Sequence, residues 1–162
     1  MMRGAKGFTL IEMLIVVAII AILASIIIVG LGPAQQSGRD ARRISDLQSI
    51  QNGLELYYQK CGFYPGGANC TKGSNSTDNY ASMKQALIGS NIGINAIPQD
   101  PSYPARQYYY GTDPAGDESS YVLGAQLENV NNSVFTTYTP PPFSPSGFDC
   151  TATSTGNYCV SL

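Results

Sequence analysis

The feature that most limits how this chain can fold is a nearly unbroken apolar run from Phe8 to Leu31. Sixteen of its 24 residues are Leu, Ile, Val or Phe. Its only polar side chains are those of Thr9, Glu12 and Ser25. Each large apolar residue favours membrane insertion by about 0.3–0.6 kcal/mol, against a cost of about 3 kcal/mol for one carboxylate. As a helix the run spans ~36 Å, so we expect residues 8–33 to form a transmembrane helix.

Charged residues of both signs lie at the N-terminal end of this run. Arg3 and Lys6 precede it, and cationic residues on a short flank predict that this flank stays in the cytoplasm. Glu12 lies five residues into the segment, where an ionisable group is costly and by default marks a function that needs a partner. The rest of the chain is then expected outside the cytoplasm.

Two simpler interpretations are a secretory signal peptide and a plain signal anchor. A signal peptide needs small residues at positions −3 and −1 of its cleavage site. The best candidate here, the bond before Ser25, has Ile22 at −3 and lies inside the apolar run. A plain anchor fits the run itself but has no use for the carboxylate of Glu12.

The sextet Gly7-Phe8-Thr9-Leu10-Ile11-Glu12, with its basic leader, resembles the processing site of type IV prepilins and of the pseudopilins of type II secretion. The resemblance implies that prepilin peptidase removes residues 1–7 by cutting after Gly7, and that the new amine of Phe8 is methylated. It further implies that Glu12 attracts the N-terminal amine of a neighbouring subunit during assembly. A buried carboxylate without such a partner would be strongly penalised.

The resemblance also implies partners and a location. The subunit would lie in the inner membrane with its head outside the cytoplasm, meet the peptidase and an assembly platform, and then polymerise with copies of itself into a helical surface filament. A pilin, a major pseudopilin of type II secretion and a competence pilin that receives DNA remain open. The cysteine-containing tail favours a pilin, whereas the strand motif Tyr121–Glu128 is similar to that of major pseudopilins.

The composition of the head argues against catalysis and against general nucleic-acid binding. The sequence has no histidine, the commonest general base and metal ligand, and no residue set supports an enzyme. Beyond residue 60 there are three basic and seven acidic residues. Such a head repels phosphate groups. The basic cluster Arg39, Arg42 and Arg43 is the one feature that favours DNA, although such clusters are more often solvated.

Four cysteines, Cys61, Cys70, Cys150 and Cys159, allow three connectivities. Two spacings of nine residues favour the local pairs Cys61–Cys70 and Cys150–Cys159, each of which would close a loop with little structure of its own. Zinc is the alternative, but structural zinc sites favour ligand pairs two to four residues apart. Paired cysteines indicate an oxidising compartment.

The remaining pattern predicts an α+β fold in which a long N-terminal helix packs on a small antiparallel sheet, the pilin fold that the resemblance implies. Gly30–Pro33 should interrupt the helix. Its amphipathic second half, residues 34–61, has apolar residues at steps of three or four. The head, residues 62–162, should hold a short helix near 79–88. Strands are expected at 108–110 and 121–128, with a weaker one at 134–138 and a disulfide-containing tail after it.

One loop of the head carries three acidic residues, Asp113, Asp117 and Glu118. Major pseudopilins often bind calcium in strand-connecting loops, and three carboxylates could anchor an ion that needs six to eight oxygens. The simpler interpretation, a solvated loop between two strands, is the one we favour.

Overall fold

The computed structural model describes residues 7–66, 70 and 80–162, with the backbone alone for residues 26–31. The chain forms two compact units, residues 1–36 and residues 37–162. The predicted leader therefore lies outside the described residues, except for Gly7.

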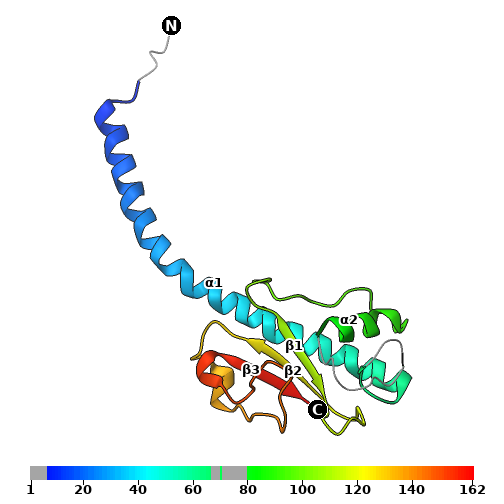
Figure 1. Ribbon diagram of the computed structural model, residues 1–162. Helices are drawn as coiled ribbons and strands as arrows, with labels where there is room; N and C mark the ends of the chain where they lie inside the picture. The colour runs from blue at the N-terminus through cyan, green and yellow to red at the C-terminus, as the bar shows by residue number, and fades with distance from the viewer. Residues whose placement is uncertain (1–6, 67–69, 71–79) are drawn as a thin grey trace. The chain divides into compact units, whose positions relative to one another are not determined.

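Helix α1, Leu10–Cys61, is continuous and contains Pro33 (Figure 1). The predicted interruption at Gly30–Pro33 is therefore wrong. Proline lacks a backbone N–H and removes only one helical hydrogen bond. The good helix formers Ala34, Gln35 and Gln36 follow it, so that the helix resumes at once.

Three strands form the antiparallel sheet, in the spatial order β1-β2-β3. β1 is Tyr108–Thr112, β2 is Tyr121–Gln126 and β3 is Asn157–Ser161. The α+β prediction is confirmed, as are its first two strands. The weaker strand predicted at 134–138 is wrong: Ser133–Thr136 is a short 3-10 helix, whose start is capped by Asn132 Oδ1 accepting from Val134 N.

The third strand comes instead from the C-terminal segment that the sequence suggested was only a tail. Tyr158 and Val160 alternate there with Cys159 and Ser161, a short version of the strand pattern. Gly156, with a φ of +82°, turns the chain into this strand, and its carbonyl accepts a hydrogen bond from Leu127 N.

The amphipathic half of α1 covers one face of the sheet. Leu47, Ile50, Leu54 and Tyr57 are fully buried. They share one core with helix α2, Tyr80–Gly89, which confirms the predicted short helix, and with the rings of Tyr108 and Tyr110. The helical period of the apolar residues thus identified the buried face.

A second, smaller core lies on the other face of the sheet. Val122, Phe148, Cys150 and Cys159 are buried there. Tyr109 points to this side and stacks on Phe148, with ring centroids 4.3 Å apart. Alternation along β1 therefore divides three successive tyrosines between two cores. The segment before β3, which contributes Tyr138, Phe143, Phe148 and Cys150 to this core, covers the second face of the sheet.

The basic cluster of α1 is not a solvated face. Arg43 is fully buried and its guanidinium bonds with Asp40, Asp100 and Glu128. Arg39 forms a bidentate ion pair with Glu128, with Nε to Oε1 at 2.7 Å and Nη2 to Oε2 at 2.5 Å. Arg42, by contrast, is 64% exposed and lies 3.8 Å from Asp46. Arg39 and Arg43 therefore join α1 to Asp100 and Glu128 in the rest of the head.

The structure pairs Cys61 with Cys70 and Cys150 with Cys159, the local connectivity that the spacing favours. The first bridge joins the end of α1 to the following loop. The second joins the covering segment to β3, so that it fixes the second layer of the head against the sheet.

Candidate assembly site at the start of the helix

The predicted processing and assembly residues lie together at the first turn of α1. Leu10 is the first helical residue, so Thr9 occupies the N-cap position and Glu12 the third position of the helix. Gly7 and Phe8 precede the cap outside the helix and are exposed. This places the predicted cleavage point next to a helix end that is well defined by its cap.

Thr9 and Glu12 bond to each other in both directions. The Glu12 Oε2 atom accepts from Thr9 N at 2.8 Å and from the Thr9 hydroxyl at 2.6 Å. The backbone N–H of Glu12 in turn donates to Thr9 Oγ1 at 3.4 Å. This reciprocal arrangement is a capping box, which satisfies backbone donors that a helix start leaves unpaired. The T-x-x-E spacing of this box is visible in the sequence as the signal of a helix start.

The capping box uses one oxygen of the Glu12 carboxylate. Within the described residues both accepted bonds go to Oε2, and none goes to Oε1. Glu12 is exposed, so Oε1 is accessible to a group from outside this chain. The carboxylate is thus held in a fixed position while half of its bonding capacity stays available.

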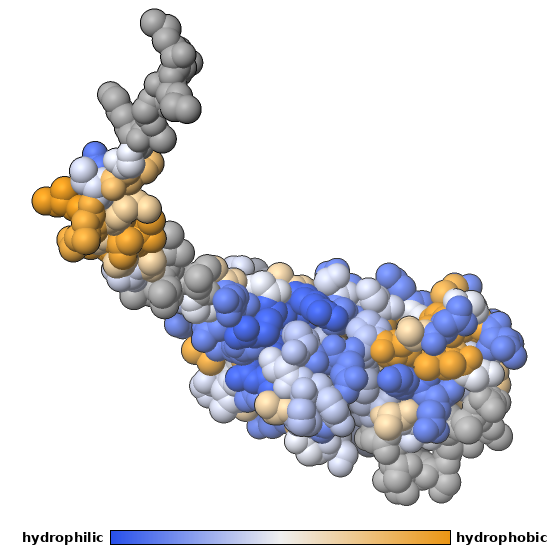
Figure 2. Space-filling model, turned by 90° about the horizontal axis from the view of Figure 1, so that it is seen from above, coloured by the Kyte–Doolittle hydropathy of each residue, from blue (hydrophilic) through white to orange (hydrophobic). Residues whose placement is uncertain are grey.

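Apolar side chains surround this carboxylate. Phe8 is 83% exposed, and the large apolar side chains that follow it, through Leu23, are each at least half exposed. Figure 2 shows this stretch as a concentration of orange surface. So much exposed apolar surface marks a contact site for protein or lipid. Within the described residues no helix is long and apolar enough to cross a membrane, and the transmembrane helix stays a prediction.

The calcium candidates do not come together as a site. Asp113 Oδ1 accepts from Ala115 N, and Asp117 Oδ1 accepts from Ser119 N. These are local turn contacts. Glu118 is buried, and its backbone carbonyl accepts from Tyr64 N. Among the described residues, no three acidic or cysteine side chains are grouped so that they could hold a metal ion.

Comparison with known proteins agrees with the motif. The family model of the prokaryotic N-terminal methylation motif matches residues 2–28. The type IV wide pilus major component PilA4 of Thermus thermophilus is 48% identical over 102 residues, 63% of this chain and 64% of that protein. The chain thus spans less than two thirds of the length of PilA4. No solved structure matches this chain.

Two further relatives align over most of the chain. The type II secretion system core protein G of Dickeya chrysanthemi is 29% identical over 163 residues, 99% of this chain and 90% of that protein. The type IV major fimbrial protein FimA of Dichelobacter nodosus is 31% identical over 140 residues, 82% of this chain and 83% of that protein. The chain belongs to the family of type IV pilins and type II secretion pseudopilins.

Proposed function

We propose that this chain is a structural subunit of a type IV pilus or pilus-like filament, which polymerises through its N-terminal helix. The observation that carries the proposal is the capping box at Glu12, set among exposed apolar side chains. Relatives named as a pilus major component and a major fimbrial protein support it. In this proposal the chain is held in the inner membrane before assembly, with its head outside the cytoplasm, and then joins a surface filament.

Processing is part of the proposal. Prepilin peptidase cuts after Gly7, and the methylated amine of Phe8 becomes the N-terminus of the mature subunit. The match to the methylation motif supports this step. An inner-membrane assembly platform then brings the amine of one subunit to Glu12 of another. The accessible Oε1 atom of Glu12 receives that amine while Oε2 remains in the capping box.

The neighbour's amine is positively charged. It compensates the negative charge of the Glu12 carboxylate once that carboxylate is surrounded by apolar helices. A carboxylate buried without a partner is strongly destabilising, so the pair forms only where the two helices have the correct axial offset. A single polar residue sets the register of a coiled coil in the same way. Glu12 therefore serves as the residue that fixes how one subunit is stacked on the next.

The test is to purify sheared surface filaments from cells that express this chain and determine the N-terminus of the subunit by intact mass. We expect a chain that begins at methylated Phe8. Filaments whose subunits retain Met1 would contradict the processing step, and cells without filaments in any condition would contradict the pilin assignment.

A second candidate, a major pseudopilin of type II secretion, is favoured by the alignment with core protein G over nearly the whole chain. It predicts that deletion of this chain blocks protein secretion. The pilin proposal predicts instead that deletion removes surface filaments and leaves secretion intact. Measuring both in one deletion strain separates the two.

A further inference from the structure

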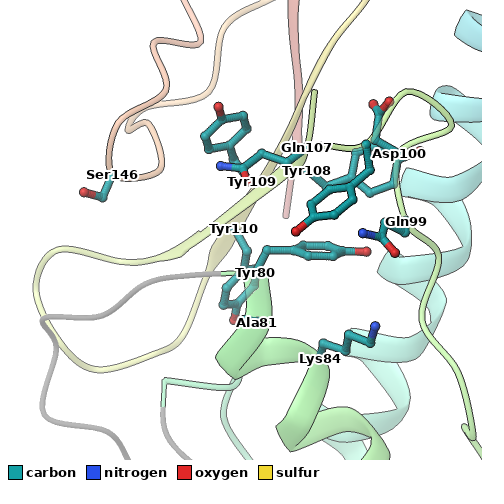
Figure 3. Close-up of a pocket in the computed structure, with 11 residues that line it drawn as sticks. Tyr80, Ala81, Lys84, Gln99, Asp100, Gln107, Tyr108, Tyr109, Tyr110 and Ser146 are labelled. Carbon is teal, nitrogen blue, oxygen red and sulfur yellow. The ribbon is translucent and has the colours of Figure 1, made fainter. Parts of the chain in front are cut away.

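A cleft of about 340 Å³ opens in the head where β1, α2 and the loop before β1 meet. Its volume lies at the lower end of the usual range for small-ligand sites, roughly 300–1,000 Å³. Five tyrosines line the cleft, Tyr80, Tyr103, Tyr108, Tyr109 and Tyr110, and polar side chains stand among them (Figure 3). The filament contacts proposed above do not involve this cleft.

The floor of the cleft is held in place by bonds to the rest of the head. The Tyr80 hydroxyl donates to the carbonyl of Pro98. The Tyr108 hydroxyl donates to Asp46 Oδ2 at 2.7 Å. The rings of Tyr80 and Tyr108 meet edge to face, with their centroids 5.6 Å apart. Asp100 is bound by Arg43, which offsets its charge. The floor of the cleft is therefore preformed and needs no rearrangement to accept a ligand.

The polar groups around the floor have no bond to other described residues and are accessible. Gln99 and Gln107 are exposed amides, and Ser146 is an exposed hydroxyl. Lys84 extends from α2 on the same side as Gln99, whose amide lies beside the hydroxyl end of Tyr80 (Figure 3). Tyr103 is 58% exposed at the rim. An amide offers both donors and an acceptor, and an ammonium offers donors alone.

We propose that this cleft binds a pyranose sugar. The C–H faces of a sugar ring pack on aromatic rings, and its hydroxyls exchange hydrogen bonds with amides, hydroxyls and an ammonium. Tyr103, which is exposed, and Tyr80, which is half-buried, provide the aromatic rings beside two amides, a serine and a lysine. The rings of Tyr108 and Tyr110 are buried and Tyr109 is stacked on Phe148, so these three complete the walls of the cleft. Nucleotides fit poorly, because Lys84 is the only cation among the lining residues and phosphate recognition relies on several. The polar rim likewise excludes a lipid tail.

The test is calorimetric titration of the full chain, solubilised in a zwitterionic detergent that has no sugar headgroup. The ligands are lactose, maltose, N-acetylglucosamine and glucuronic acid, with sorbitol as an open-chain control that carries hydroxyls but no ring. We expect saturable binding of at least one pyranose and none of sorbitol. No saturable heat with any of the four sugars, or equal heat with sorbitol, overturns the proposal.

Substitutions then assign the binding to this cleft. Gln99→Ala and Gln107→Ala should each weaken the affinity about tenfold, the loss of one or two hydrogen bonds. Tyr103→Phe should bind like the wild type, because it keeps the ring. Gln85→Ala, on α2 but outside the cleft, is the matched control and should bind normally. Unchanged affinity in both cleft variants, or an equal loss in Gln85→Ala, overturns the assignment.

Discussion

The guanidinium of Arg43 forms a two-point pair with the carboxylate of Asp100, at 2.8 and 3.0 Å, and both side chains are completely buried. Asp40 completes the arrangement from one turn earlier, since its carboxylate bonds Arg43 and also accepts from the backbone N–H groups of Glu128 and Asn129. One buried cation thus joins α1 to the loop before β1 and to the chain after β2.

Replacing Arg43 should therefore destabilise the head severely. Arg43→Met keeps much of the side-chain length but leaves two buried carboxylates without their cation, at a cost of about 3–5 kcal/mol. Chemical denaturation of the full chain, followed by near-ultraviolet circular dichroism of its tyrosines, measures the free energy of unfolding. Arg42→Met, at the exposed position beside it, is the control and should change it by no more than about 0.5 kcal/mol. Equal effects of the two substitutions would show that the buried pair does not stabilise the head.

This cluster also shows where sequence reasoning stopped. Leu47, Ile50, Leu54 and Tyr57 repeat with the helical period, and such a local pattern predicts a buried face. The burial of Arg43 depends on Asp100, 57 residues away, and no local pattern records that contact. Charged residues on a helix are therefore assigned to solvent by default.

The same contrast holds for the sheet and for the candidate site. β1 begins with three successive tyrosines and β2 with Tyr-Val-Leu, whereas β3 is as long as β1 but begins with a polar residue, Asn157, and follows a loop that ends in glycine. A strand of that kind forms only because β2 offers an edge to pair with. At the candidate site, the motif identified Glu12. Only the structure shows that Oε2 accepts both bonds of the capping box while Oε1 accepts none from the described residues.

The loss of folding stability at low pH should depend on Glu128. Hydrogen bonds from Arg39, with further help from Arg43, lower the pKa of Glu128 from its ordinary value of 4.5 to about 2, although burial opposes them. Its contribution is complete above pH 4.5 and is lost as the pH falls towards 2. Glu128→Gln should be less stable than the wild type at pH 7, with the difference shrinking between pH 4.5 and 2. A difference that stays constant over this range would contradict the linkage.

The bridge between Cys150 and Cys159 should stabilise the second layer of the head. Replacing both cysteines with serine opens a ten-residue loop, whose closure is worth about 2.5–3 kcal/mol in the chain-entropy model. It also puts two polar groups into the smaller core beside Phe148. Relative to the wild type, amide hydrogen exchange in this variant should accelerate more in β3 than in α2. Equal acceleration in both elements would mean that the bridge supports the head as a whole.

Gly124 should not tolerate a side chain. A Cβ at this position of β2 would lie 2.7 Å from ring atoms of Phe148, closer than real contacts allow. Gly124→Ala should therefore cost about 1–3 kcal/mol of stability by overpacking. The double variant with Phe148→Leu should recover part of that cost, because the ring is gone. A double variant whose cost is the sum of the two single costs would show that the contact with Phe148 is not the cause.

The last prediction concerns Glu12, whose carboxylate both closes the capping box and offers a free oxygen to a neighbour. Glu12→Val should leave membrane association intact, because it removes a costly charge from an apolar segment. Cleavage after Gly7 should also continue, since Gly7 and Phe8 are unchanged. Filament assembly should fail, because the neighbour's amine would be buried without a partner at every subunit contact.

The two roles of Glu12 can be separated by a second substitution. Thr9→Val removes the hydroxyl of the capping box but keeps the carboxylate and the bond to it from the Thr9 backbone N–H. It should weaken the start of the helix by about 1 kcal/mol and still permit filaments. Each variant is expressed beside the native assembly apparatus, and sheared filaments are counted by electron microscopy. Normal filament yield from Glu12→Val would show that the carboxylate does not direct assembly, whereas equal loss in both variants would assign the defect to the helix cap.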